Sequence, residues 1–136
     1  MSTYVLDANA VIRYLENGKD WEKVRALIAR TANEEIKLCI SVVNWGEVLY
    51  IAVRKVGLSK AVAAMKILGT AFEIVSVGEV ETEAAVALKL NFKLGYADSF
   101  AAELAIRKSA TIVTAGPDFA KLGKRLKIMP LERHRK

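Results

Sequence analysis

The sequence predicts an α/β fold: a three-layer α/β/α sandwich with a central parallel sheet. Short apolar runs alternate along the chain with longer segments whose apolar residues recur every three or four positions. Strands that alternate with helices in this way form a parallel sheet covered on both faces. A length of 136 residues fits one domain, residues 1–136, and the content of 53% hydrophobic and 26% charged residues excludes a disordered chain.

The first half of the chain contains two predicted strands, each followed by two helices. Asp20 is a candidate N-cap, Ser41 can cap a helix that Gly57 ends, and Ser59 opens the next helix, which stops near Gly69. The expected order is a strand over 4–6, helices over 8–15 and 20–32, a strand over 37–40, and helices over 42–56 and 59–69.

The second half continues the alternation. Ser76 and Glu79 have the spacing of a capping box for a long helix that Gly95 closes. The expected order is a strand over 72–75, helices over 76–93 and 97–107, a strand over 111–114, a short helix over 119–122 and a last strand over 128–131.

Composition narrows the classes of function. The net charge of +6 and the basic C-terminal segment predict a polyanion or an acidic protein as partner. No apolar run approaches the roughly 18–20 residues that cross a bilayer, so we expect no membrane association and a soluble protein of the cytoplasm. Cys39 is the only cysteine and lies in an apolar stretch, where a small buried hydrophobe is expected rather than a reactive thiol.

Three acidic residues stand in apolar surroundings at predicted element ends or inside a helix. Asp7 follows the first strand, at the sheet edge where ligand sites of open α/β folds lie. Glu47 lies inside the helix over 42–56, and Asp98 stands where the helix over 97–107 begins. Each also has a purely structural interpretation. Asp7 can cap the helix that follows it, Glu47 can be an exposed helical glutamate, and Asp98 can interact favourably with the dipole of its helix.

Together, the three acids predict a metal site. Carboxylates gathered at one place repel one another, and a divalent cation removes that penalty. Oxygen ligands favour Mg²⁺ or Mn²⁺ over zinc, and the only histidine, His134, lies in a basic tail unsuited to a zinc cluster. We therefore expect Asp7, Glu47 and Asp98 to bind Mg²⁺ or Mn²⁺.

Four motifs, in this order and spread over nearly the whole chain, resemble those of the PIN-domain family. They are YVLDANAVI at 4–12, NWGEV at 44–48, YADSFAA at 96–102 and IVTAGPDF at 112–119. The similarity is greatest to the VapC-type toxin nucleases of bacterial and archaeal toxin–antitoxin pairs.

The resemblance implies a PIN-like fold and hydrolysis of RNA phosphodiester bonds with one or two divalent ions. It also implies a homodimer and an antitoxin partner that masks the acidic cleft, by which we mean the site of Asp7, Glu47 and Asp98. Asp7 and Asp98 would hold the principal metal ion, with Glu47 contributing directly or through water. The side chains implied to orient water or ligand are those of Thr114 and Ser99, with Asn9 and Asn44 as weaker candidates.

The last motif departs from the family pattern. Family members commonly carry an aspartate two residues after the threonine, and here that position is Gly116. Asp118, two residues further on, matches a more peripheral acidic position, which makes it a candidate fourth site residue. We expect one tight and one weak metal site.

Three other classes of protein share part of this pattern. A haloacid-dehalogenase-like phosphatase needs a second acid two residues after Asp7, where Asn9 stands. A receiver domain needs an aspartate at the end of its third strand, where Ser76 follows Val75. The third alternative, a PIN-like module that binds RNA or a protein without cleavage, stays open because of Gly116.

Overall fold

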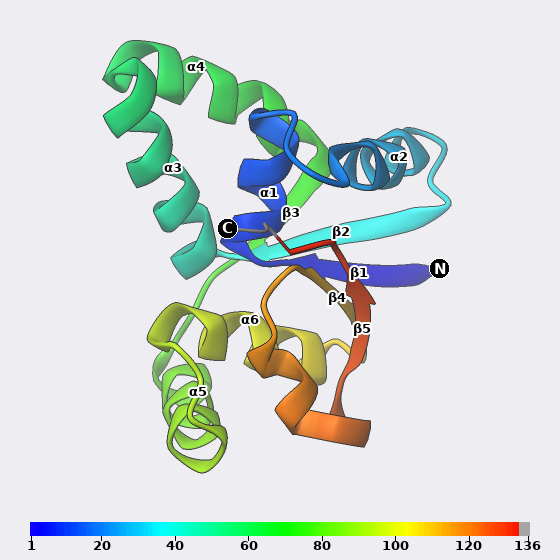
Figure 1. Ribbon diagram of the computed structural model, residues 1–136, viewed down its shortest axis with the longest axis vertical. Helices are drawn as coiled ribbons and strands as arrows, with labels where there is room; N and C mark the ends of the chain where they lie inside the picture. The colour runs from blue at the N-terminus through cyan, green and yellow to red at the C-terminus, as the bar shows by residue number, and fades with distance from the viewer. Residues whose placement is uncertain (134–136) are drawn as a thin grey trace.

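A five-stranded parallel sheet forms the centre of the protein, with the strand order β3-β2-β1-β4-β5 (Figure 1). The computed structural model describes residues 1–133. The predicted parallel sheet is confirmed, since every neighbouring pair of strands runs parallel. The strands are β1 Ser2–Leu6, β2 Ile36–Ser41, β3 Phe72–Val75, β4 Thr111–Thr114 and β5 Lys127–Pro130.

Helices cover both faces of this sheet, which confirms the three-layer sandwich. Figure 1 shows α1, α2, α3 and α4 on one face and α5 and α6 on the other. The α-helices are α1 Ala8–Leu15, α2 Trp21–Ala32, α3 Val42–Val56, α4 Leu58–Leu68, α5 Glu79–Phe92 and α6 Tyr96–Arg107. Two 3₁₀ segments, η1 Gly69–Ala71 and η2 Asp118–Arg125, complete the order.

The pleat of the sheet divides the core into two. Neighbouring strand residues point to opposite faces, so Leu6 and Leu38 pack in the cluster beneath α1 to α4, whereas Val5 and Cys39 pack in the cluster beneath α6. Cys39 is fully buried, and burial followed by the Glu73 carboxylate raises the pKa of its thiol to about 11. The expected buried hydrophobe is therefore confirmed.

Three predicted helix starts differ from the structure. Asp20 precedes α2 with φ 64°, but its side chain does not cap the helix. The capping box of Ser76 and Glu79 is wrong, because α5 begins at Glu79 and the backbone N–H of Gly78 donates to Glu81 Oε1 at 2.8 Å. Ser59 does not open α4 either, since the helix already begins at Leu58.

The segment after β5 is tied to the loop between α1 and α2. The Glu132 amide donates to Asp20 Oδ2 at 2.7 Å, and the Glu132 carbonyl accepts from Arg13 Nη1. Lys19 Nζ lies 3.4 Å from Glu132 Oε1. We call Arg13, Lys19, Asp20 and Glu132 the C-terminal clasp; it satisfies the Asp20 carboxylate, which explains why Asp20 does not cap α2.

Within residues 1–133, no helix combines the length and the apolar character needed to cross a membrane. His134 lies outside the described residues.

Candidate active site

Asp7 sits at the carboxyl end of β1 and serves as the N-cap of α1. Its Oδ1 accepts the Ala10 amide at 2.9 Å, and its Oδ2 accepts the hydroxyl of Thr114 at the end of the neighbouring strand β4. The Thr114 hydroxyl oxygen in turn accepts the Gly116 amide at 2.8 Å. Only 2% of Asp7 is exposed. Helix, strand and loop therefore hold one buried carboxylate in a fixed orientation.

The environment of Asp7 disfavours its charge. Burial raises the pKa of its carboxyl from the ordinary 3.8 to about 6, against the opposing effect of hydrogen bonds from Thr114 and Ala10. The carboxylates of Asp98 and Glu47 raise this pKa further. The charges of Asp98 and Glu47 therefore act on Asp7, and the charge of Glu47 also acts on Asp98.

Asp98 lies in the first turn of α6, partly buried. A Cβ atom at Gly95, the N-cap of α6, would lie 3.4 Å from Asp98 Oδ2, so the carboxylate stands over the start of its own helix. Burial raises the pKa of Asp98, and the charges of Glu47 and Asp118 raise it further. The buried Ser99 hydroxyl donates to the Gly95 carbonyl at 2.8 Å and thereby braces this turn.

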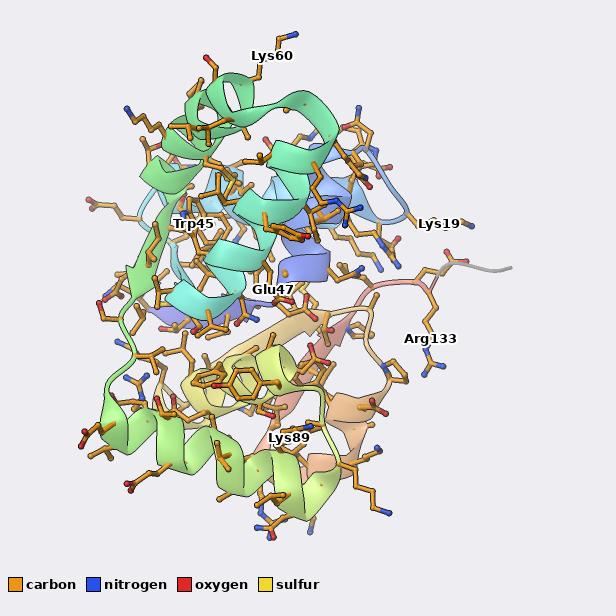
Figure 2. The ribbon with its side chains drawn as sticks, turned by 90° about the vertical axis from the view of Figure 1, so that its left-hand side faces the viewer. Lys19, Trp45, Glu47, Lys60, Lys89 and Arg133 are labelled. Atoms are coloured by element: carbon orange, nitrogen blue, oxygen red, sulfur yellow. The ribbon has the colours of Figure 1, made fainter. Side chains whose placement is uncertain are left out.

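Asn44 links Glu47 to the backbone of α6 through a pair of hydrogen bonds. Its Nδ2 donates to Glu47 Oε1 and to the Ala97 carbonyl, both at 3.1 Å, so that α3 is tied to the residue before Asp98. In Figure 2, Glu47 lies where α3 approaches α6. Asn44 is fully buried, and its Oδ1 has no hydrogen-bond partner among the described residues. Asn44 therefore holds Glu47 in one orientation, a contact that the sequence did not indicate, since it named Asn44 only as a weaker candidate for orienting water or ligand.

Asp118 opens η2 at the periphery of the site. It is close enough to raise the pKa of Asp98, yet its Oδ1 lies 3.2 Å from Lys121 Nζ in an exposed ion pair. Gly116 does not have a positive φ, so a side chain there meets no backbone strain. A Cβ atom would instead lie 3.2 Å from Thr114 Oγ1 and 3.4 Å from Phe119 Cε2. A side chain at position 116 is therefore limited by the space beside Thr114 and not by the backbone conformation.

Asp7 and Asp98 open onto a pocket of about 240 Å³, whose lining does not include Glu47. Its lining contains both acidic and basic side chains: Asp7, Asn9, Arg13, Asp98, Ala115, Gly116 and Arg133. Among residues 1–133, no three His, Cys, Asp or Glu side chains already stand close enough together to hold a metal ion. The donor chemistry nevertheless fits a hard divalent cation, because a buried carboxylate whose charge is disfavoured by two others gains most from such an ion. Joint metal binding by Asp7, Glu47 and Asp98 stays a prediction.

Comparison with known proteins identifies the family. The PIN-domain family model matches residues 4–125. The chain belongs to the PIN-domain family. No curated protein sequence matches it.

Solved structures share the fold of this PIN domain. VapBC2 from Rickettsia felis, bound to a DNA fragment from its promoter, has a TM-score of 0.74 at 18% identity and covers 94% of this chain and 98% of its own. A toxin–antitoxin complex from Klebsiella pneumoniae has a TM-score of 0.67 at 24% identity, with coverages of 96% and 99%. VapC20 from Mycobacterium tuberculosis, a sarcin–ricin loop cleaving toxin, has a TM-score of 0.68 at 20% identity, with coverages of 88% and 95%.

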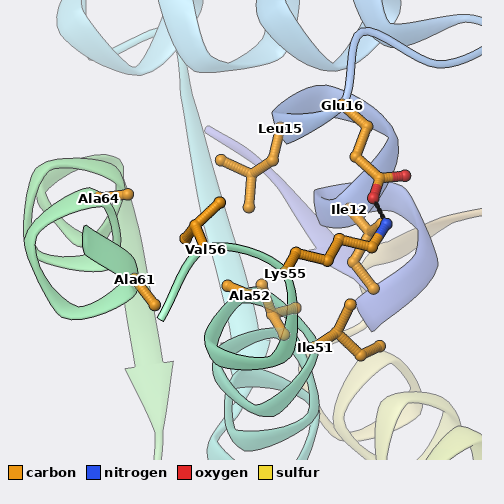
Figure 3. A pocket seen from close by; sticks show the side chains of 10 residues that line it. Ile12, Leu15, Glu16, Ile51, Ala52, Lys55, Val56, Ala61 and Ala64 are labelled. Atoms are coloured by element: carbon orange, nitrogen blue, oxygen red, sulfur yellow. Dashed lines mark ion pairs between the residues drawn. The ribbon is translucent and has the colours of Figure 1, made fainter. Parts of the chain in front are cut away.

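The PIN domain also has an apolar groove of about 200 Å³ between α1, α3 and α4 (Figure 3). Leu15 and Val56 lie on its sides, and the ion pair of Lys55 with Glu16 crosses from α3 to α1. Asp7 caps α1 and Glu47 lies on α3, so the helices that build the groove also carry two of the acids.

Proposed function

We propose that this PIN domain is a ribonuclease that hydrolyses RNA phosphodiester bonds with Mg²⁺ or Mn²⁺. The observation that carries the proposal is the buried Asp7 carboxylate, whose pKa is raised by its burial and by the charges of Asp98 and Glu47. A protein that buries an acid beside two like charges without need loses stability. Such an arrangement is explained by a ligand of opposite charge, and the membership in a nuclease family favours a catalytic metal ion.

In the proposed site, Asp7 and Asp98 hold the principal ion and Glu47 contributes directly or through water. A bound divalent ion would activate water and stabilise the charge that develops on the leaving oxygen. The Thr114 hydroxyl keeps Asp7 in one orientation, and Asn44 does the same for Glu47. These hydrogen bonds order the Asp7 and Glu47 carboxylates before substrate arrives.

Charge counting leads to one tight and one weak metal site. Three carboxylates carry a charge of about −3, enough for one divalent ion, and a second would leave roughly +1 until an RNA phosphate arrives. Asp118 is paired with Lys121 and Gly116 supplies no acid, so neither residue changes this count. We infer that the second ion is recruited together with substrate.

We further propose that the protein is the toxin of a toxin–antitoxin pair, forms a homodimer and acts on RNA in the cytoplasm. The similarity of its fold to solved toxin–antitoxin complexes supports the antitoxin partner. The apolar groove would receive an apolar segment of that antitoxin. The groove is lined from Ile12 onward in α1 and from Val48 onward in α3, so an antitoxin segment that continues from it toward the start of these helices would reach Asp7 and Glu47 and mask them.

A cleavage assay tests the ribonuclease proposal. Purified protein is incubated with total RNA in Mn²⁺, in Mg²⁺ and in chelator, alongside the variants Asp98→Asn and Glu83→Gln. We expect metal-dependent cleavage by the unaltered protein and by the Glu83 control, which loses an exposed charge on α5. The Asp98 variant should be inactive. Cleavage that survives in chelator, or in Asp98→Asn, contradicts the proposal.

The second candidate function is a PIN module that binds RNA or a protein without cleavage. Gly116 favours it, because the acid common at this position in the family is absent. RNA that binds tightly in Mn²⁺ but stays intact under all metal conditions would establish this alternative.

A further inference from the structure

Two arginines line the pocket onto which Asp7 and Asp98 open. Arg13 lies in the last turn of α1 and is only 3% exposed, whereas Arg133 is exposed on the segment after β5. The pocket thus combines carboxylates, which suit metal ions, with guanidinium groups, which suit anions. Metal binding does not explain why Arg13 and Arg133 line this pocket, so the two arginines need a separate explanation.

Arg13 is a buried cation with incomplete pairing. Its Nη1 donates to the Lys19 carbonyl at 3.1 Å and to the Glu132 carbonyl, which are both uncharged acceptors. Its Nε is buried and has no hydrogen-bond partner among residues 1–133. A buried guanidinium is costly unless its donors are satisfied and its charge is balanced. The charge of Arg13 also lowers the pKa of Asp20, but the described residues give the guanidinium no hydrogen bond to a carboxylate, and an anion bound in the pocket would supply one for its free Nε.

The C-terminal clasp places Arg133 at the same pocket. Glu132, the residue directly before it, is held through its amide by Asp20, through its carbonyl by Arg13 and through its carboxylate by Lys19. Figure 2 shows Arg133 and Lys19 on the same side of the molecule. Three contacts on one residue fix the backbone from which the Arg133 side chain extends to the pocket.

We propose that Arg13 and Arg133 form an anion site that binds a phosphate of the RNA strand beside the acidic cleft. The proposal rests on RNA being the ligand of this site. Guanidinium groups present several donors in a plane and bind phosphate oxygens in pairs, which makes arginine better suited to this task than lysine. Arg133 contacts the phosphate directly. Arg13 balances the negative charge of the phosphate and keeps the C-terminal clasp closed through the Glu132 carbonyl.

RNA binding in the absence of metal tests this site. Fluorescence anisotropy measures the affinity for a labelled single-stranded RNA oligonucleotide in chelator, from about 20 to 200 mM NaCl. We expect Arg133→Ala to weaken binding roughly five- to tenfold at low salt and to reduce the slope of log K against log salt by about 0.7, the value of one phosphate contact on a single strand. Arg133→Lys should restore the slope and part of the affinity.

The matched control is Arg25→Ala. Arg25 is exposed on α2, where its guanidinium lies 4.9 Å from the centre of the Trp21 ring, and it does not line the pocket. This variant loses the same charge and should keep the slope of the unaltered protein. Arg13→Met serves as a second variant once its circular dichroism matches that of the unaltered protein, but the Arg133 variants decide the question alone.

Several results would overturn the proposal. They are an unaltered protein that binds no RNA at the lowest salt, an Arg133→Ala variant with an unchanged slope, or a control that loses as much as Arg133→Ala. An Arg133→Ala variant that binds RNA normally but holds Mn²⁺ differently would instead make Arg133 a counter-charge of the metal site. The ribonuclease proposal is judged separately, by cleavage: a protein that binds RNA through Arg133 and never cleaves it has the anion site but not the activity.

Discussion

Replacing Asp7 with Asn should stabilise the metal-free protein at neutral pH. The pKa of the Asp7 carboxyl lies near 6 in the folded protein and near its ordinary 3.8 in the unfolded chain. Each pKa unit corresponds to about 1.4 kcal/mol, so ionised Asp7 costs the fold roughly 3 kcal/mol. Asn is as good an N-cap as Asp and can still accept the Ala10 amide.

The net gain is smaller than this cost. An Asn amide facing Thr114 leaves the threonine hydroxyl without its present acceptor, a loss of about 1 kcal/mol. We therefore expect a net increase of about 2 kcal/mol in the free energy of unfolding. With a urea dependence of about 2 kcal/mol per molar, the unfolding midpoint rises by about 1 M.

The pH dependence of the difference identifies its cause. As pH rises from about 3.8 to about 6, the unfolded chain releases the Asp7 proton first, so the stability of the unaltered protein falls relative to that of the variant. Below this window the penalty disappears, and above it the full penalty is present. Urea unfolding in chelator at several pH values between about 4 and 8 measures this profile.

Asp20→Asn is the control with the opposite sign. The pKa of Asp20 is lowered, chiefly by the hydrogen bond from the Glu132 amide, so its charge stabilises the fold above its ordinary pKa of 3.8 and this stabilisation is lost as pH falls. The control should therefore be destabilised at neutral pH. An Asp7→Asn variant that is less stable than the unaltered protein at neutral pH in chelator, or a difference that does not change with pH, would contradict this prediction.

Four further outcomes are expected. Asp98→Asn should abolish cleavage while circular dichroism stays unchanged, and cleavage that survives in the folded variant would refute the role of Asp98. Gly116→Asp should tighten the second metal site in calorimetry and raise cleavage, although crowding of Thr114 costs about 1 kcal/mol of stability; two equally tight sites in the unaltered protein would show that the fourth charge is already supplied. Asn44→Ala should lower cleavage roughly ten- to hundredfold, because Glu47 loses its positioning hydrogen bond, and unchanged cleavage would refute that role. Light scattering should report a dimer, and a strict monomer at all concentrations would exclude it.

Strands and most helices could be predicted because their signals are local. The apolar runs and the three- and four-residue spacing depend on neighbours in sequence, and Asp7 and Ser41 cap helices as local patterns indicate. The wrong predictions of helix caps arise where a residue binds a partner distant in sequence, or where a neighbouring pair of residues forms the cap instead. Asp20 is satisfied by Glu132, far along the chain, and Gly78 with Glu81 replaces the equally well-spaced Ser76 and Glu79.

The residues of the candidate site also differ in how much of their role can be predicted from the local sequence. Asp7, Glu47 and Asp98 could be predicted as candidate ligands because acids in apolar surroundings are costly unless they have a partner. Asn44 was weak because its role depends on Ala97, which lies on another helix. Arg13 carried no signal at all, because its burial and its place in the pocket arise only when the segment after β5 returns to α1.

The strand order has a consequence for synthesis of the protein on the ribosome. β1 is the central strand, but its partner β4 begins only at Thr111, so one side of β1 stays open until most of the chain has emerged. Long-range parallel pairing of this kind forms late in folding. Until β4 emerges, the Asp7 carboxylate also lacks the hydrogen bond from the Thr114 hydroxyl. The acid site therefore cannot be complete before β4 has emerged, and in a truncated product that ends before β4 the Asp7 carboxylate would keep the Ala10 amide but lack the Thr114 hydroxyl.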